Sequence, residues 1–496
     1  MKKIIFLLIF IIPGLISSCD SYLDINSDPN SPSEEDVTSD MIFPGAEMNI
    51  ATGYGDYMRI VGGYFSQQYA QQFGTSNYLD YSEFNMSATR SSSTYSQLNT
   101  HGLLSLNTIK EKSTENEEWG TYLAATTLRV FVIQSLVDAY GEIPYTEALD
   151  VTNLSPKYDE GEDVYAGIIA ELDSALNKVS GSEIVCTNFL FGSTSVDNWV
   201  KFANALKLKL LMRESNVKDV QSELSALIQE NNFPTEDISW DDCWTDEKGA
   251  ANPFYQEDFA SYFATQVNLI ANLAFMKTMT DSNDARRDKF FETNDDGDYT
   301  GGISGSYFST SDKYKAAYFC RPVASYDMPV YLINVFEIDF FKAEYYARYG
   351  SADDAEKYYK AGIEASFETS GLDVSDAESI YTTSYPYDNG NYKELIGIQK
   401  WIALGGTNNF EAWCELRRLD FPKFTDVKGS DIYDEANDVY DPSLYTAGTL
   451  YTPITVNSEL GDNQLLERFK YAESTTSRNS NAPDNKLGNV PVFWAK

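Results

Sequence analysis

The sequence predicts a mostly α-helical fold in which helical pairs support a loop-rich, irregular half. Apolar residues recur at three-to-four spacing in several segments between residues 119 and 367, as on the buried face of a helix. Two such segments, 335–349 and 352–367, are separated only by a short turn. Long stretches rich in Gly, Ser, Asn, Asp and Tyr lie between the helices, and loops of that length in a compact protein are usually functional.

The first 18 residues have the layout of a secretory signal peptide. Two lysines precede an apolar run over residues 4–12, which is too short to span a bilayer, since a span needs about 20 residues. Residues 16–19, Ile-Ser-Ser-Cys, resemble a lipobox, in which the cysteine is acylated. We therefore expect a signal peptide over 1–18, lipidation of Cys19 and a polar tether over 19–40. Ordinary cleavage with a free thiol at Cys19 is the alternative.

The remaining chain, 41–496, shows no composition break that would mark a second domain. It is expected to form a single helical domain with long loops. Apolar periodicity predicts helices, before the pair at 335–367, over 119–139, 163–179, 197–213 and 265–280.

The clearest helical pair is the one formed by 335–349 and 352–367. The turn between them, Tyr349-Gly350-Ser351, places Gly at the end of the first helix. Small and bulky residues follow tetratricopeptide spacing at Ala343, Tyr346, Ala355, Tyr359 and Gly362. No second copy follows in register, so a simple repeat array is not predicted. Residues 41–118, 281–330 and 425–496 are expected to be long loops.

Composition limits the partners. The formal net charge of −38 repels phosphate backbones, which disfavours nucleic-acid binding, and it repels anionic lipid, which favours a lipid tether over a basic patch. The chain holds 35 Tyr, a residue that offers both a flat apolar face and a hydroxyl to a sugar or a peptide. Cys186, Cys243, Cys320 and Cys414 lack C-x-x-C spacing, so a zinc site is not expected, and any disulfide pairing among them stays open.

The motifs of most enzyme classes are missing. His101 is the only histidine, which excludes H-E-x-x-H zinc sites and disfavours His-based triads, and no P-loop is found. A carboxylate pair for glycoside hydrolysis stays open, but so many acidic residues would form such pairs by chance. Residues 294–298 resemble a calcium loop in composition but fail the EF-hand spacing, so an Asx-Gly turn is favoured.

Several segments, in order along the chain, resemble the SusD/RagB family, and especially its SusD-like branch. They span nearly the whole mature chain. The segments are Tyr22-Leu23-Asp24-Ile25-Asn26, the run from Asp138 to Leu149, the run from Asn198 to Leu208, Lys400-Trp401 with Glu411-Ala412-Trp413 and Arg417-Arg418, and the end from Val490 to Lys496.

The resemblance implies tetratricopeptide-like helical pairs supporting a loop-rich, irregular half. It also implies a non-enzymatic, cofactor-free lipoprotein of the outer membrane that faces the exterior. Such a protein captures a glycan or peptide and delivers it to a SusC-like TonB-dependent transporter. A surface glycoside hydrolase and a helical scaffold without a small ligand are the alternatives.

Two Tyr-rich loop stretches are the predicted ligand contacts. This prediction rests partly on the resemblance to the SusD/RagB family. A ring face would stack on a sugar or side chain, while Asn and Arg supply directional hydrogen bonds. The predicted contacts are Asn77, Tyr78, Tyr81 and Tyr95 in the first stretch and Tyr299, Tyr307, Tyr314, Tyr318 and Arg321 in the second.

Overall fold

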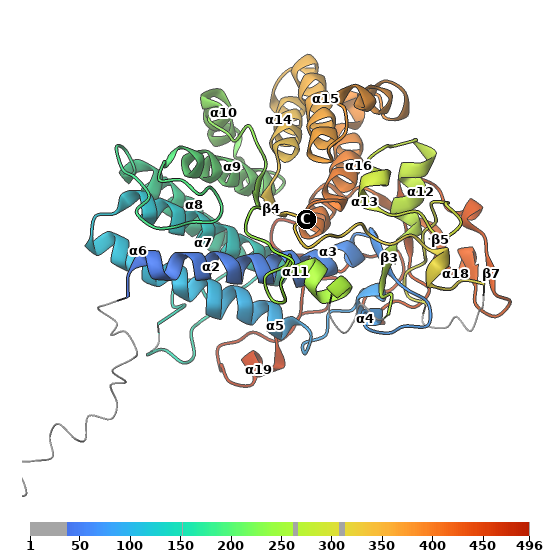
Figure 1. The fold of residues 1–496 in the computed structure, drawn as a ribbon, viewed down its shortest axis with the longest axis horizontal. Coiled ribbons are helices and arrows are strands. Elements are labelled where there is room, and N and C mark those ends of the chain that lie inside the picture. Colours follow the sequence, from blue (N-terminus) through green and yellow to red (C-terminus); the bar gives the residue numbers. More distant parts are fainter. Residues whose placement is uncertain (1–36, 151, 261–265, 307–312, 496) are drawn as a thin grey trace, which may run out of the picture.

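Helices build most of the computed structural model, which confirms the predicted fold class (Figure 1). The structure describes residues 37–150, 152–260, 266–306 and 313–495. The expected signal peptide, Cys19 and Tyr307 therefore lie outside the described residues. The first described helix, α2, begins at Ser39, where Thr38 accepts a hydrogen bond from the backbone N–H of Met41. Helical structure thus starts before the expected end of the tether at residue 40.

A long apolar helix, α7 (Trp119–Tyr140), is buried on nearly every face. By length and composition it is the one helix of the described residues that could cross a membrane, but 94% of its apolar window is buried inside the protein. It is therefore a core helix. The helices that pack around it are α2 (Ser39–Gly53), α6 (Leu104–Glu115), α8 (Gly161–Lys178) and α9 (Asp197–Glu214).

Periodicity located α7, α8 and α9 to within two residues at each end. Gly141 ends α7 with a φ of +86°, and a Cβ on it would lie 2.5 Å from Nη2 of Arg468. The positive φ therefore favours glycine at this position.

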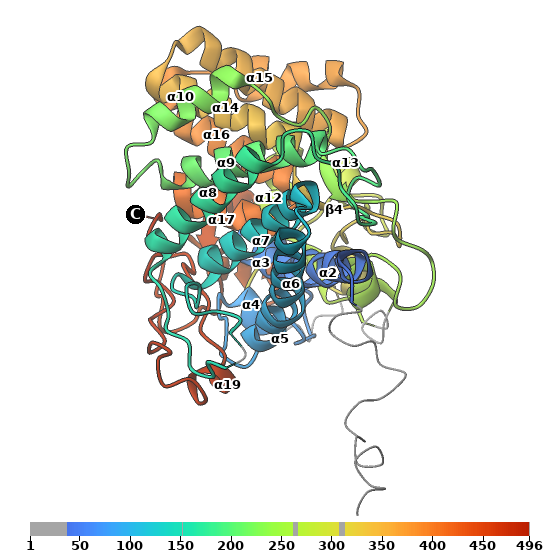
Figure 2. The same cartoon turned by 90° about the vertical axis from the view of Figure 1, so that its left-hand side faces the viewer.

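The predicted helical pair is present as α14 (Val335–Tyr349) and α15 (Ala352–Thr369). Ser351 caps α15 by accepting a hydrogen bond from the backbone N–H of Asp354. A Cβ on Gly362 would lie 2.8 Å from the Phe340 ring, so the small residue allows the two helices to approach closely. A second pair follows, α16 (Tyr392–Gly405) and α17 (Asn409–Leu419). The α14–α15 pair lies at one end of the molecule in both views (Figures 1 and 2).

Short strands join distant parts of the irregular half. The pairs are β1 (Tyr69–Gln71) with β3 (Leu269–Ala271), β2 (Ile238–Trp240) with β4 (Val330–Ile333), and β6 (Tyr433–Asp434) with β7 (Val439–Tyr440), all antiparallel, and β5 (Lys423–Lys428) with β8 (Thr449–Thr452), which is parallel. Each pair is a two-stranded sheet.

Several further helices and turns are short. They are α10 (Gln221–Glu230), α4 (Leu79–Ser82), α5 (Ser91–Tyr95), α11 (Pro253–Tyr255), η3 (Gln256–Ala260), α13 (Arg287–Phe290), η5 (Ala316–Tyr318), η6 (Val374–Ala377), η7 (Ile380–Ser384), η8 (Asn389–Asn391), α18 (Gly429–Ile432), η9 (Pro442–Leu444) and α19 (Glu473–Thr476).

Two sequence predictions about elements are wrong. The helix expected over 265–280 is α12 (Leu273–Asp281), because residues 269–271 form β3 and the Asn272 side chain caps the helix. Residues 41–118 are largely helical rather than a loop; besides α2 and α6 they hold η1 (Tyr54–Met58), α3 (Arg59–Phe65) and η2 (Ser96–Leu103).

Tertiary contact explains the helix in this Gly-rich stretch, because it overrides weak local propensity. A Cβ on Gly62 of α3 would lie 2.4 Å from the carbonyl oxygen of Asn409, so the glycine lets α3 lie directly against α17. Residues 281–330 and 425–496 are mostly irregular, as expected. The four cysteines of the described chain, Cys186, Cys243, Cys320 and Cys414, are all free thiols.

Candidate functional site

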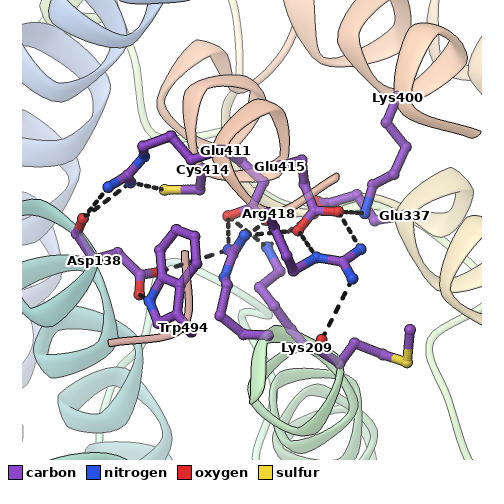
Figure 3. A network of polar contacts seen from close by, with 12 residues as sticks. Asp138, Lys209, Glu337, Lys400, Glu411, Cys414, Glu415, Arg418 and Trp494 are labelled. Atoms are coloured by element: carbon purple, nitrogen blue, oxygen red, sulfur yellow. Dashed lines mark hydrogen bonds and ion pairs between the residues drawn. The ribbon is translucent and has the colours of Figure 1, made fainter. Parts of the chain in front are cut away.

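A buried network of charged residues lies between α7, α9, α14, α16 and α17 (Figure 3). Five of its residues belong to the family-like motifs: Asp138, Lys400, Glu411, Arg417 and Arg418. Glu415 Oε1 lies 2.6 Å from Arg213 Nη1, and its Oε2 lies 2.7 Å from both Lys400 Nζ and Arg418 Nη2. Lys209 Nζ lies 2.9 Å from Glu337 Oε2. We call the following residues the charge network: Asp138, Lys209, Arg213, Glu337, Glu344, Lys400, Glu411, Glu415, Arg417 and Arg418.

Cations and carboxylates in the charge network are matched in number, and all are buried. Burial opposes ionisation of Glu344, but the guanidinium groups of Arg418 and Arg348 outweigh it and lower its pKa to about 2. Burial likewise opposes ionisation of Glu415, and Arg418 and Lys400 outweigh it and lower its pKa well below the ordinary value. No carboxylate of the network is open to a substrate, so none supplies the acid or nucleophile of the hydrolase alternative. The residues of the charge network hold the helices together.

Two of the four predicted contacts in the first stretch are buried. Tyr78 and Tyr81 are buried and stack with their ring centroids 5.8 Å apart. Arg90 lies over the Tyr81 ring at 5.5 Å and donates a hydrogen bond to the carbonyl oxygen of the partly exposed Asn77. In this structure neither buried tyrosine offers a ring face to a ligand, because both faces are used in packing.

The partner of Tyr78 is a residue that sequence reasoning missed. The Tyr78 hydroxyl donates a 3.2 Å hydrogen bond to Oδ2 of Asp258, which is only 3% exposed. Burial raises the pKa of Asp258 to about 7, Glu257 adds to this effect, and Tyr78 and Arg321 oppose it. No signal in the sequence distinguishes Asp258 from the other carboxylates.

The second predicted stretch forms an aromatic cluster with the chain near β6 and β7. Tyr314 is buried, with its ring centroid 5.0 Å from that of Tyr318 and 5.7 Å from that of Tyr440. Tyr299 and Tyr318 are partly exposed, and Arg287 lies 3.9 Å above the Tyr299 ring. Tyr314 is therefore core, whereas Tyr299 and Tyr318 keep some open surface.

Buried rings, rather than an open surface, connect the two predicted stretches. Phe73, just before the first stretch, packs on Phe319 of the second with centroids 5.3 Å apart. Arg321 lies 4.9 Å above the ring of Phe259, which directly follows Asp258 in η3. The two stretches thus approach each other through contacts in the protein interior.

Among the predicted contact tyrosines that the structure describes, Tyr95 differs from the others because it lines an open groove of about 410 Å³. The groove is bounded by three segments that are far apart in the sequence: 92–100, 144–158 and 472–479. Two of them are visible in Figure 1, where α19 lies near α5. We call this feature the Tyr95 groove, and its lining residues are Ser92, Tyr95, Ser96, Asn99, Thr100, Pro144, Ala148, Leu149, Leu154, Pro156, Tyr158, Ala472, Ser474, Thr475, Arg478 and Asn479.

The groove combines aromatic, apolar and hydrogen-bonding groups. Tyr95 and Tyr158 are partly buried, and Leu154 is 86% exposed. Asn99 and Arg478 supply an amide and a guanidinium. Sequence reasoning found only Tyr95, because no local pattern shows that residues near 99, 158 and 478 face one space.

The turn at 294–298, which resembles a calcium loop in composition, is stabilised by hydrogen bonds within the turn. Asn294 Oδ1 accepts hydrogen bonds from the backbone N–H groups of Asp296 and Asp298, and Gly297 has a φ of +85°. This is the favoured Asx-Gly turn. Across the described ranges, no group of three or more His, Cys, Asp or Glu residues is arranged to hold a metal ion.

The family SusD-like_2, described as "Starch-binding associating with outer membrane", matches residues 33–443. No curated protein matches the chain. A SusD homolog from Bacteroides uniformis has a similar solved structure, with 23% identity, a TM-score of 0.70, and coverage of 91% of this chain and 98% of that one. A chitin-binding SusD homolog from Flavobacterium johnsoniae matches at 20% identity and a TM-score of 0.71, also covering 91% and 98%. At these identities the solved structures show a shared fold.

Proposed function

Because the chain belongs to the SusD-like family, we propose that it is a cell-surface lipoprotein that captures a glycan and delivers it to a SusC-like TonB-dependent transporter. The description of the family, starch-binding and associated with the outer membrane, supports both the ligand class and the location. The chitin-binding relative also supports a glycan over a peptide.

The observation that carries the proposal is the Tyr95 groove. The part of the Tyr95 side chain that lines the groove can contact the C–H face of a sugar, and the Asn99 amide can bond its hydroxyls. The exposed side chain of Leu154 adds an apolar contact at the rim. The partly exposed Asn77, Tyr299, Tyr318 and Arg321 stay predicted contacts of a second surface.

Anchoring through Cys19 is part of the same proposal. One acyl chain gives only marginal membrane binding, so stable attachment needs more than one chain. The net charge of −38 makes attachment through a basic surface patch unfavourable. A lipid tether would hold the soluble body beside a transporter in the outer membrane.

Titration calorimetry on the chain from Asp20 onward tests the ligand class. Maltohexaose, chitohexaose and a neutral hexapeptide are the probes, and we expect saturable binding of at least one hexasaccharide. Tyr95→Ala should weaken it about tenfold, the loss expected for one stacked ring. Tyr326→Ala, an exposed ring outside the groove, is the control and should bind like the parent protein.

Three results would count against glycan capture at this groove. Binding of the peptide alone would favour peptide as the ligand. Equal affinity of the Tyr95→Ala variant and the parent would remove the groove as the site. Release of reducing ends during the titration, abolished by changing one carboxylate, would favour the hydrolase alternative.

Delivery is tested by affinity capture of the full, tethered chain in mild detergent. A co-purifying β-barrel of the TonB-dependent class is the expected partner. Recovery of the chain as a lone monomer would contradict a stable complex with a transporter.

A further inference from the structure

We propose that the Tyr95 groove selects an anionic saccharide and that Arg478 is the residue that recognises its charge; this rests on the proposed function. The chemical class is an oligosaccharide carrying carboxylate or sulfate groups. The inference goes beyond glycan capture because it assigns a charge preference and a residue that sets it.

Among the described residues that line the groove, Arg478 alone is charged. It lies just after α19, is exposed, and its guanidinium makes no hydrogen bond or ion pair with any described residue. The exposed Glu473 at the start of α19 does not line the groove. In a chain with 75 acidic and 37 basic residues, the described lining of this concave surface thus holds one uncommitted cation and no carboxylate.

Carboxylates near the groove are engaged elsewhere. Glu142 forms an ion pair with Arg468 at 2.9 Å. Glu147 accepts a hydrogen bond from the Asn153 side chain. Asp159 accepts hydrogen bonds from the backbone and side chain of a threonine. None of these three carboxylates forms an ion pair with Arg478, so its guanidinium is available to an anion.

A second group in the groove can donate hydrogen bonds to an anion. The side-chain amide of Asn99 lines the groove and is uncommitted within the described chain. Together with Arg478, it gives the groove an amide and a guanidinium as donors, and none of the described lining residues is acidic.

The rest of the lining favours a saccharide over a small inorganic anion. Pro144, Leu149 and Leu154 present apolar surface beside the rings of Tyr95 and Tyr158. A pyranose ring has both an apolar C–H face and polar edges, so it can contact such a mixed surface over its whole length. A phosphate or sulfate ion alone would leave the apolar part unused.

The test compares three hexasaccharides by calorimetry on the chain from Asp20 onward: hexagalacturonate, a sulfated carrageenan hexasaccharide and neutral maltohexaose. At 50 mM NaCl we expect at least one acidic probe to bind about tenfold tighter than maltohexaose. Arg478→Gln should weaken that probe about 10- to 100-fold, as expected for loss of a hydrogen bond to a charged group. Arg478→Lys should recover part of the loss, and 300 mM NaCl should narrow the preference.

The controls separate this inference from the proposed function. Arg478→Gln should change maltohexaose affinity less than twofold, and Lys423→Gln, an equal charge change on an exposed residue outside the groove, should leave every affinity unchanged. Equal affinity for acidic and neutral probes, or no effect of Arg478→Gln, would overturn the charge preference while leaving glycan capture intact. A preference for an acidic peptide over all three probes would overturn the saccharide class. Failure of every saccharide to bind would remove both proposals.

Discussion

The indole N–H of Trp494 donates a 2.8 Å hydrogen bond to Oδ1 of Asp138, across 356 positions of the chain. The contact joins the C-terminal segment to the end of the central helix α7. Arg213 lies 5.0 Å above the Trp494 ring and 3.5 Å from Oδ2 of Asp138, so one buried cation contacts both partners. Two motifs that are far apart in the sequence therefore form a single buried contact.

Trp494→Phe should destabilise the protein by about 1–3 kcal/mol, because it keeps a ring but leaves a buried carboxylate oxygen with one donor fewer. Urea unfolding followed by circular dichroism measures the change. Trp119→Phe is the matched control, since that partly buried indole makes no hydrogen bond with the described residues, and it should shift the midpoint much less. Equal shifts for both variants would mean that the hydrogen bond to Asp138 contributes nothing.

Glu415→Gln should lower the free energy of unfolding by about 3–5 kcal/mol, because it leaves buried cations without their carboxylate. Glu415 contacts Arg213, Lys400 and Arg418. Asp462→Asn is the control: it breaks the exposed ion pair with Lys428, and such pairs contribute about 0–1 kcal/mol. A Glu415→Gln protein as stable as the control would contradict a structural role for the charge network.

Asp258 should make stability fall as pH rises from about 4 to 7. Its pKa is about 7 in the folded protein and 3.8 in the unfolded chain, so within this window the folded state holds a proton that the unfolded state has lost. The groups around it are Tyr78, Glu257, Arg321 and Asp56. Asp258→Asn should therefore raise the free energy of unfolding at pH 8 by about 2–4 kcal/mol and change it little at pH 4.

The measurement is a series of urea melts between pH 4 and 8. Asp246→Asn, a fully surface-exposed carboxylate in a loop, serves as the control and should leave the pH dependence as in the parent protein. An Asp258→Asn protein with an unchanged pH slope would show that the carboxyl does not hold a proton in the fold.

Cys19→Ser should release the protein from the membrane. The predicted acyl chains contribute about 0.8 kcal/mol per buried CH₂, and the serine cannot carry them. Membrane fractionation measures the release of the protein. Metabolic labelling with a fatty-acid analogue measures the loss of the acyl chains. A Cys19→Ser protein that stays in the membrane fraction, or a labelled N-terminus in that variant, would contradict the predicted lipidation.

Local patterns account for the part of the fold that could be predicted. The apolar periodicity of α7, α8, α9, α14 and α15 is visible in short windows of the sequence. The bounds that it predicted lie within two residues of the observed ones. The Gly-rich helix α3 was missed because its stability comes from close packing against α17 rather than from its own residues. Residues 269–271, which were expected to be helical, form β3 instead. Their pairing with β1 overrides the local helix propensity.

The sequence by itself predicted the export signal, the helical class and the order of the family-like motifs, because each depends on residues that are neighbours along the chain. Only the tertiary structure decided that Tyr78, Tyr81 and Tyr314 are core while Tyr95 lines a groove. It also decided that the buried carboxylates of Glu415 and Glu344 are held in ion pairs. Burial and pairing depend on side chains brought from hundreds of residues away, and a one-dimensional pattern does not contain those distances.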